Sequence, residues 1–117
     1  MYFMFAEAGK NATTWNIGQL NNWDVSNVID MSDMFHGAGY SAASWNIGQL
    51  NNWDVSKVTA MNAMFSSAGR SATSFNIGNI SNWNTSNVTT MGNMFYNTAP
   101  VATNWALDLS GWNVSKV

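Results

Sequence analysis

Five residues, Met61-Asn62-Ala63-Met64-Phe65, identify the organisation of this chain, because close copies of them recur along its whole length. The copies are Met1-Tyr2-Phe3-Met4-Phe5, Met31-Ser32-Asp33-Met34-Phe35 and Met91-Gly92-Asn93-Met94-Phe95. Their final phenylalanines stand at positions 5, 35, 65 and 95, so the period is 30 residues. We call these segments the Met-Phe boxes. Recurrence at a fixed period of this length is typical of repeat architectures.

Two aromatic markers follow the same period. The first occupies Trp15, Trp45, Phe75 and Trp105. The second occupies Trp23, Trp53, Trp83 and Trp112, and its last step is 29 because one residue is missing from the fourth copy. These markers predict a single segment, residues 1–117, of about four tandem repeats. Both termini fall inside a repeat, so we expect the segment to be part of a longer chain.

The pattern within one repeat predicts short strands and short helical turns. Apolar and polar residues alternate over Trp23–Ser26, as in a half-buried strand. The next apolar residues are three or four positions apart, which favours one or two turns of α- or 3₁₀-helix facing a core: Val28, Met31, Met34 and Phe35. Strands and turns repeating in this way predict a β-rich α/β solenoid that resembles a leucine-rich repeat.

Glycines recur at two places in the repeat. Gly9, Gly39 and Gly69 follow the Met-Phe boxes, and a glycine retained at one place predicts a corner with a positive φ. The fourth copy has Ala99-Pro100 instead. The second set predicts a bulge or kink, where glycine often stands in a strand: Gly18, Gly48 and Gly78.

Composition excludes several classes of function. The chain has four Lys and Arg against six Asp and Glu, a net charge of −2, so it lacks the basic surface that binds nucleic acid through phosphates. Anionic membrane surfaces are unsuitable partners for the same reason. Cysteine is absent, which excludes disulfides. No apolar run is long enough to cross a bilayer, so we expect no membrane insertion in this segment.

No residue pattern predicts catalysis, a metal or a cofactor. His36 is the single histidine, and its equivalents are Ala6, Ser66 and Tyr96, so we expect an exposed, variable position rather than a member of a catalytic triad. Asp24 and Asp54 stand at equivalent positions and could share a calcium ion, but a turn-capping role fits them better. We therefore expect a chain that is not an enzyme.

The best candidates for recognition are aromatic or variable residues. The row Trp15, Trp45, Phe75 and Trp105 would stack sugar rings or anchor a protein if exposed, and would pack in the core if buried. For the other row, beginning at Trp23, we expect a packing role. Tyr40 and Arg70 follow the corner glycines, where the side chain varies between copies while its surroundings repeat. Variable side chains on a regular scaffold favour binding at that edge.

The repeat resembles a known group of bacterial repeats. The pattern is Asn-Trp-Asp-Val-Ser-Asn-Val followed by Met-x-x-Met-Phe, and its copies are Trp23–Phe35, Trp53–Phe65, Trp83–Phe95 and, in part, Trp112–Val117. It is similar to the short tandem repeats of bacterial surface proteins, a family of unknown function related to the BspA-like leucine-rich repeats. The resemblance implies an extracellular protein on the bacterial cell surface, with adhesion to host or neighbouring-cell proteins or glycans. It implies no catalytic or binding residues.

Three hypotheses follow for the function. The first is a non-enzymatic module for adhesion or for protein or glycan binding. The second is a structural spacer, or a filament-forming array that associates end to end. The third is an accessory segment of a carbohydrate-active enzyme or a phage-derived fibre. An exposed aromatic row would favour the first or third, and ends that stack on other copies would favour the second.

Overall fold

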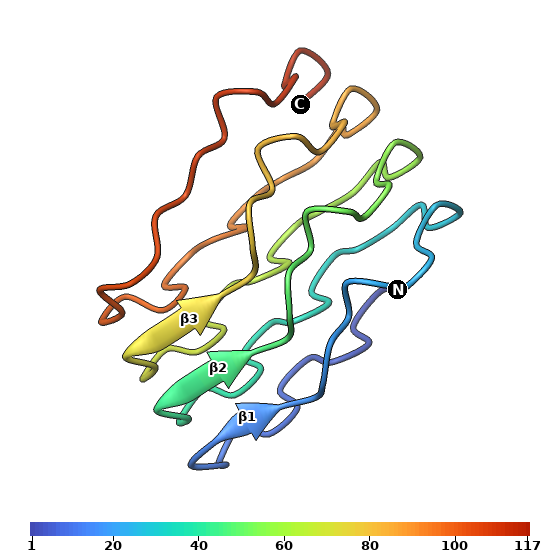
Figure 1. Ribbon diagram of the computed structural model, residues 1–117. Coiled ribbons are helices and arrows are strands. Elements are labelled where there is room, and N and C mark those ends of the chain that lie inside the picture. The colour runs from blue at the N-terminus through green and yellow to red at the C-terminus, as the bar shows by residue number, and fades with distance from the viewer.

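Three short parallel strands form the regular secondary structure of the chain: β1 (Trp15–Asn16), β2 (Ser44–Asn46) and β3 (Ser74–Asn76). In this computed structural model, which describes residues 1–117, they form one sheet in the order β1-β2-β3 (Figure 1). The register pairs Trp15 with Trp45 and Trp45 with Phe75, each one period apart. The aromatic residue of each strand points inward and its polar neighbours face solvent.

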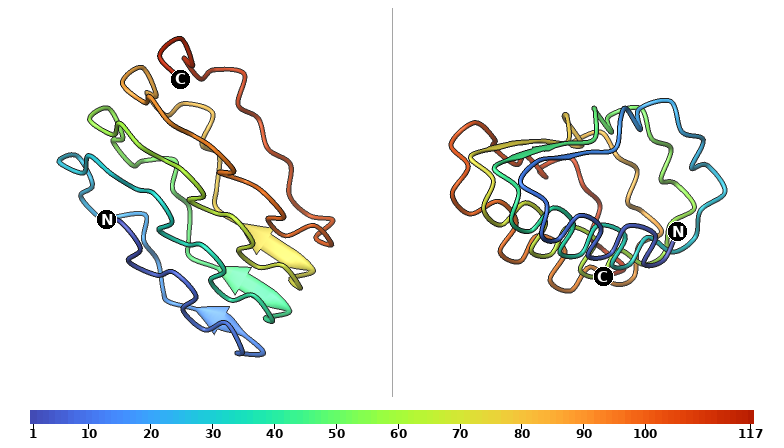
Figure 2. Two further views of the ribbon diagram at one scale, coloured as in Figure 1. Left: turned by 180° about the vertical axis from the view of Figure 1, so that it is seen from behind. Right: turned by 90° about the horizontal axis from the view of Figure 1, so that it is seen from below.

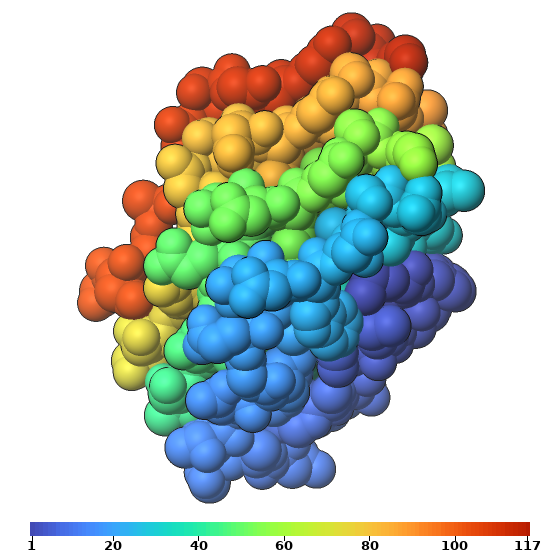
Figure 3. Space-filling model, turned by 45° about the vertical axis from the view of Figure 1, so that its right-hand side comes forward, coloured from blue at the N-terminus to red at the C-terminus, as the bar shows by residue number.

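Successive stretches, of 30 residues each apart from a shorter last one, lie directly on one another. We call them the first to fourth layers, residues 1–30, 31–60, 61–90 and 91–117. Isolated parallel bridges join Asp30 to Ala60 and Ala60 to Thr90, on a part of the layer distant from the strands. The ribbon views show the layers from three sides, with the termini in the first and fourth layers (Figures 1 and 2). In the space-filling view they form bands in chain order, from blue to red (Figure 3).

The predicted fold class, a leucine-rich-repeat-like solenoid with helical turns, is wrong. No residue is helical, and the three strands are only two or three residues long. The radius of gyration is 13.2 Å, which is that of a compact globule of this length. The chain is therefore a small globule whose interior is held by side-chain stacking and turn hydrogen bonds rather than by helices.

Left-handed residues explain why the predicted helix over Val28–Phe35 does not form. The Met34 N–H donates to the Met31 carbonyl at 3.3 Å, which is a turn bond. The next N–H, of Phe35, instead donates to Met64 in the following layer at 2.8 Å. Asp33, which directly precedes Met34 in this turn, has φ 54°, and a helix cannot continue through a left-handed residue. The apolar spacing of three thus belongs to a series of β-turns.

The same pattern recurs in every Met-Phe box. The equivalents of Asp33 all have positive φ although none is glycine, namely Phe3 (55°), Ala63 (51°) and Asn93 (57°). On this side of the stack, N–H groups of one layer donate to carbonyls of the next layer. On the corner side the direction reverses: Gly39 N–H donates to Ala8, and Gly69 N–H donates to Ala38, at 2.8 and 3.0 Å.

The strand predicted at Trp23–Ser26 is also absent, because a side chain caps this segment. The Asp24 carboxylate accepts hydrogen bonds from the Ser26 N–H at 3.0 Å and the Ser26 hydroxyl at 2.6 Å. This is an Asx turn, which directs the backbone away from a ladder. The strands form instead at the first aromatic marker.

The glycine corners are confirmed: Gly9, Gly39 and Gly69 have φ of +62°, +54° and +55°. Ala99 occupies the fourth corner with φ 38°. The second set of glycines also has positive φ, but it lies beyond the strands, so these residues kink the chain and form no bulge: Gly18, Gly48 and Gly78.

The core is a set of ladders that run through the layers. Phe35 stacks on Phe5 and Phe65 at centroid distances of 5.5 and 5.4 Å, with ring planes within 8° of parallel. Phe65 continues to Phe95 at 5.6 Å. The inner methionines of the boxes are buried beside these rings, as predicted: Met31, Met34, Met61 and Met64. Each layer therefore buries its apolar residues against the equivalent residues of its neighbours.

Candidate functional site

The first aromatic row, for which the sequence left both recognition and core packing open, lies mainly in the core. Trp15, Trp45 and Phe75 are buried, and Trp45 is 1% exposed. Their rings stack at 4.9 Å between Trp15 and Trp45 and at 4.4 Å between Trp45 and Phe75. Trp105, in the fourth layer, is only partly buried. A ligand on the surface cannot reach the first three rings, whose geometry is that of packing residues.

The second set of candidates, Tyr40 and Arg70, lies together on the surface. The Arg70 guanidinium carbon is 5.8 Å from the centre of the Tyr40 ring, a cation–π contact between neighbouring layers. Tyr40 is partly buried and Arg70 is exposed. Lys10 and Pro100 occupy the same position in the first and fourth layers. We call these four residues the corner edge.

The backbone aligns the corner edge. The residue before each of these positions turns the chain with a positive φ: it is a glycine before Lys10, Tyr40 and Arg70, and Ala99 before Pro100. The Ser41 N–H then donates to the Lys10 carbonyl, and the Ser71 N–H donates to the Tyr40 carbonyl, both at 3.0 Å. These bonds place the variable residues of neighbouring layers beside one another. The edge is thus held by its backbone, whatever side chain each layer carries.

One of the two positive charges of the corner edge is paired with a carboxylate of the same chain. The Lys10 ammonium donates to the Glu7 carboxylate at 2.8 Å. This hydrogen bond and the paired charge lower the pKa of Glu7 and raise the pKa of Lys10. Both groups are exposed, so their pairing adds little to stability. Arg70 forms no salt bridge, which leaves its charge available to a partner.

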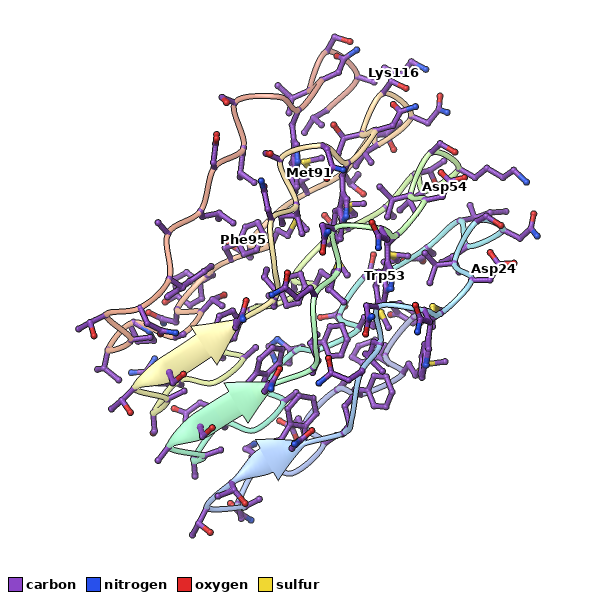
Figure 4. All side chains as sticks on the ribbon, viewed as in Figure 1. Asp24, Trp53, Asp54, Met91, Phe95 and Lys116 are labelled. Carbon is purple, nitrogen blue, oxygen red and sulfur yellow. The ribbon has the colours of Figure 1, made fainter.

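The aspartates singled out in the sequence act as turn caps. Asp24 and Asp54 lie at the same edge of neighbouring layers (Figure 4). Asp54 accepts from the Ser56 N–H at 3.0 Å, and hydrogen bonds from the following serine lower the pKa of both carboxylates. Asn84 and Asn113 accept the equivalent bonds. The chain contains no group of three or more His, Cys, Asp or Glu residues placed to hold a metal ion.

His36 differs from the predicted exposed position. It is half-buried, and its Nδ1 atom is buried without a hydrogen-bond partner. No other side chain forms a hydrogen bond with its ring.

The second tryptophan row is buried except at its start. Trp53, Trp83 and Trp112 are buried, and each indole N–H donates to a carbonyl of the preceding layer, for example from Trp53 to Leu20 at 2.8 Å. Trp23 was expected to pack in the same way, but it is 39% exposed and its indole donates to no group. Trp23 lies in the first of the layers within residues 1–117, which supply no carbonyl equivalent to that of Leu20 for its indole.

The largest apolar depression lies at the other end of the stack. It has a volume of about 270 Å³ and is lined only by apolar residues of the fourth layer, Met91, Met94, Phe95, Leu109, Trp112 and Val114. Met91 and Phe95 are labelled there in Figure 4. Its lining contains no polar side chain, and the sequence did not predict this depression.

The family comparison supports a bacterial family of unknown function. The chain belongs to the family described as "Mycoplasma protein of unknown function, DUF285", whose model matches residues 1–117. No curated protein and no solved structure matches the chain. None of its segments forms a helix able to reach across a lipid bilayer.

Proposed function

We propose that this member of a bacterial family of unknown function is a non-enzymatic adhesion module that binds a partner protein through its corner edge. The observation that carries the proposal is the contrast between that edge and the core. At the corner edge the four layers carry Lys, Tyr, Arg and Pro, whereas the stacked phenylalanine of the Met-Phe box is the same in every layer. A regular scaffold with variable, solvent-facing side chains suits recognition.

The chemistry of the edge favours a protein over a sugar. Tyrosine and arginine are the residues most often found at the energetic centres of protein interfaces. Here the Arg70 guanidinium lies over the Tyr40 ring, and both residues follow a corner whose backbone bonds to the neighbouring layer. The pair therefore presents a flat ring and a cation with little freedom to lose on binding. The row that would have stacked sugars, from Trp15 to Phe75, is buried.

The proposed location is the exterior of the bacterial cell. It is supported by the resemblance of the repeat to the short tandem repeats of bacterial surface proteins, carried by the Trp-Asp-Val and Met-Phe segments. A polar surface of Asn, Ser and Thr with few charges fits this setting.

A binding screen tests the proposal. The chain would be screened against immobilised host-matrix and bacterial surface proteins, with a glycan array in parallel. We expect saturable binding to a protein that falls at least tenfold in the double variant Tyr40→Ser/Arg70→Ser. Tyr96→Ser is the matched control, because Tyr96 is an exposed tyrosine outside the corner edge and its third-layer equivalent is Ser66. Binding that both variants retain, or binding to glycans alone, would contradict the proposal.

A second function, that of a structural spacer, is favoured by the burial of Trp15, Trp45 and Phe75. A folded chain that binds nothing in either screen would support the spacer. Surface staining of intact cells with an antibody to the chain tests the location independently, and a signal only after permeabilisation would oppose it.

A further inference from the structure

Between its two aromatic markers, the fourth layer is one residue shorter than the other layers. In the third layer Ile77 is followed by Gly78 and Asn79, whereas in the fourth layer Leu107 is followed directly by Asp108. Asp108 is the equivalent of Asn79, because each side chain accepts a hydrogen bond from the N–H two residues later, at 3.0 Å. The residue that the fourth layer lacks is therefore the counterpart of Gly78.

The missing residue interrupts the hydrogen bonds between the third and fourth layers. At this place the Leu20 N–H donates to the Ile47 carbonyl at 2.9 Å, and the Leu50 N–H donates to the Ile77 carbonyl at 2.8 Å. Each of these bonds runs from one layer to the next. The equivalent N–H of the third layer, that of Ile80, donates to nothing within the chain. The unpaired donor lies where the third layer meets the fourth, and a ligand with an acceptor group would satisfy it.

The strand ladder ends at the same place, and a side chain supplies the bonds that a further strand would make. No strand follows β3 in the fourth layer (Figure 1). The Asn104 amide instead accepts from the Phe75 N–H at 3.0 Å and donates to the Phe75 carbonyl at 3.4 Å. Its equivalents in the other layers have no amide side chain: Thr14, Ser44 and Ser74. The backbone groups of Phe75 are therefore paired and closed to an added strand.

A depression opens where the missing glycine would have packed. In the first three layers this place is filled, because the glutamine of one layer lies against the glycine of the next. A Cβ atom on Gly48 would stand 2.7 Å from Gln19 Oε1, and one on Gly78 would stand 2.9 Å from Gln49 Cβ. Asn79, the third-layer equivalent of these glutamines, is shorter and has no glycine to cover. The result is a hollow of about 290 Å³ lined by residues of both layers: Gly78, Asn79, Ile80, Ala106, Leu107 and Asp108.

The polar groups of this hollow include both donors and an acceptor. The Asn79 Oδ1 atom accepts from the Ser81 N–H, but the N–H groups of the same amide donate to nothing. Asp108 accepts from the Ser110 N–H at 3.0 Å, and a carboxylate can accept further hydrogen bonds. Backbone and side-chain hydrogen bonds from Ser110 lower the pKa of Asp108, so the group is ionised at neutral pH. With the Ile80 N–H, the hollow offers donors from two residues and one anionic acceptor.

An aromatic ring lies beside these polar groups. A second hollow, of about 140 Å³, shares three lining residues with the first and is also lined by Trp105. The Trp105 ring is partly buried and tilted by 53° from Phe75. Its indole N–H donates to no group, whereas that of Trp45 donates to the Ala38 carbonyl at 2.9 Å. The ring therefore supplies an apolar face with a polar edge. We call the two hollows together the interlayer site.

We propose that the interlayer site binds one unit of a neutral saccharide. Sugar hydroxyls both donate and accept hydrogen bonds, and so can pair with the Ile80 N–H, the Asn79 amide and the Asp108 carboxylate. The C–H groups on the face of a pyranose ring suit the apolar face of the Trp105 indole. The carboxylate disfavours an anionic ligand, and no Lys or Arg lines the site to offset its charge.

An extended peptide fits the interlayer site less well than a saccharide does. A peptide that added a strand to β3 would need the N–H and carbonyl of Phe75, which are bonded to Asn104. None of the corner-edge residues lines the interlayer site. Saccharide binding here and protein binding at the corner edge can therefore succeed or fail independently.

Two variants test the interlayer site. Asp108→Asn keeps the turn cap, because Asn79 caps the equivalent turn of the third layer, but it removes the anionic acceptor. Asp54→Asn is the matched control, since Asp54 caps a turn in the same way and does not line the site. Insertion of one glycine between Leu107 and Asp108 restores the length of the repeat and should close the site. Circular dichroism and thermal unfolding would show whether each variant is folded, and Asp108→Asn decides if the insertion variant is not.

Titration with methyl glycosides of neutral hexoses and N-acetylhexosamines, and with their disaccharides, gives the readout through tryptophan fluorescence and saturation-transfer NMR. We expect the wild type, Asp54→Asn and the corner-edge variant Tyr40→Ser/Arg70→Ser to bind at least one of these sugars saturably. Binding should weaken at least tenfold in Asp108→Asn and be lost in the folded insertion variant. A wild type that binds no sugar at millimolar concentration would overturn the proposal. Sugar binding that either site variant retains, or that the corner-edge variant loses, would overturn it as well.

Amide hydrogen exchange, followed by NMR, places the bound sugar in the structure. Without ligand, the Ile80 N–H should exchange faster than the Leu50 N–H, because only the latter donates to a carbonyl, that of Ile77. A saturating sugar should slow exchange at Ile80 at least tenfold and leave Leu50 unchanged. A bound sugar that leaves exchange at Ile80 unaltered would overturn the placement.

Discussion

Replacing Gly39 by alanine is the sharpest test of how closely the layers pack. A Cβ atom at this position would stand 2.6 Å from Trp45 Cδ1 and 2.8 Å from Trp15 Cβ. Both distances are shorter than side-chain contacts allow, and both tryptophans are buried and stacked. The alanine would therefore have to displace a ring that has no free space to enter.

The expected loss of stability has two parts. Gly39 has φ +54°, and a residue with a Cβ atom in this left-handed region costs about 1–2 kcal/mol. Forcing an additional carbon into a packed core costs a further ~1–3 kcal/mol. We therefore expect Gly39→Ala to reduce the free energy of unfolding by roughly 2–5 kcal/mol.

Gly37→Ala is the matched control. Gly37 has a similar φ of +63°, but its added Cβ would meet nothing closer than Glu7 Cγ, at 3.5 Å. The equivalent positions already hold residues other than glycine with positive φ, namely Glu7 (56°), Ser67 (58°) and Asn97 (53°). Only the backbone cost remains, so we expect a loss of about 1–2 kcal/mol.

Urea unfolding followed by tryptophan fluorescence and circular dichroism would measure both variants. The difference between the two variants isolates the collision with the rings, because the backbone cost is common to both. If Gly39→Ala were no less stable than Gly37→Ala, the packing argument would be refuted. The fourth layer offers a comparison: Ala99 stands at this corner, and the following Trp105 is tilted by 53° from Phe75, against 24° between Trp15 and Trp45.

Three further predictions concern the core and the turns. Phe65→Ala should cost about 3–5 kcal/mol in urea unfolding, because the ring is fully buried between two others, and a loss below ~1 kcal/mol would contradict the ladder. Trp83→Phe should lower the free energy of unfolding by about 1 kcal/mol more than Trp23→Phe, because only Trp83 loses a hydrogen bond from its indole N–H. Equal urea unfolding midpoints for the two variants would contradict the role of this hydrogen bond. The free energy of unfolding should fall below about pH 4, because the folded-state pKa values of Asp24 and Asp54 are lowered. The two carboxylates therefore contribute their full stability above the unfolded-state pKa, and this contribution is lost as the pH falls through the folded-state pKa. Thermal unfolding from pH 6 to pH 2 of the wild type and of Asp24→Asn/Asp54→Asn would test this, since the Asn side chain caps the same turn in the later layers without titrating; an unchanged pH dependence in the variant would contradict it.

The repeat made the core predictable but not the local backbone. The 30-residue period places Phe35 and Phe65 in one ladder, because equivalent residues meet whenever successive periods stack. The helix was predicted wrongly because a turn series and a helix share an apolar spacing of three. The left-handed residues that separate the two conformations are Asp33 and its equivalents, and none is a glycine that would have marked them.

The ends and the candidate site show a related limit. A periodic pattern describes the burial of a side chain that has a neighbouring layer on both sides, so it predicted that Trp23 is buried like Trp53. Trp23 has a layer on one side only and is exposed. For the corner edge the sequence located the variable positions of Tyr40 and Arg70, but the contact between them depends on how far each layer is displaced from the next.

The opposed directions of the hydrogen bonds on the two sides of the stack have an electrostatic consequence. Along the Met-Phe boxes each layer donates to the one after it, whereas at the corners it donates to the one before it. Peptide dipoles aligned in one direction add up along a helix and leave partial charges at its ends. Here the two rows oppose each other, so their dipoles offset one another along the stacking axis. The layers therefore build up a smaller net dipole along the stacking axis than they would if all of their interlayer hydrogen bonds ran in one direction.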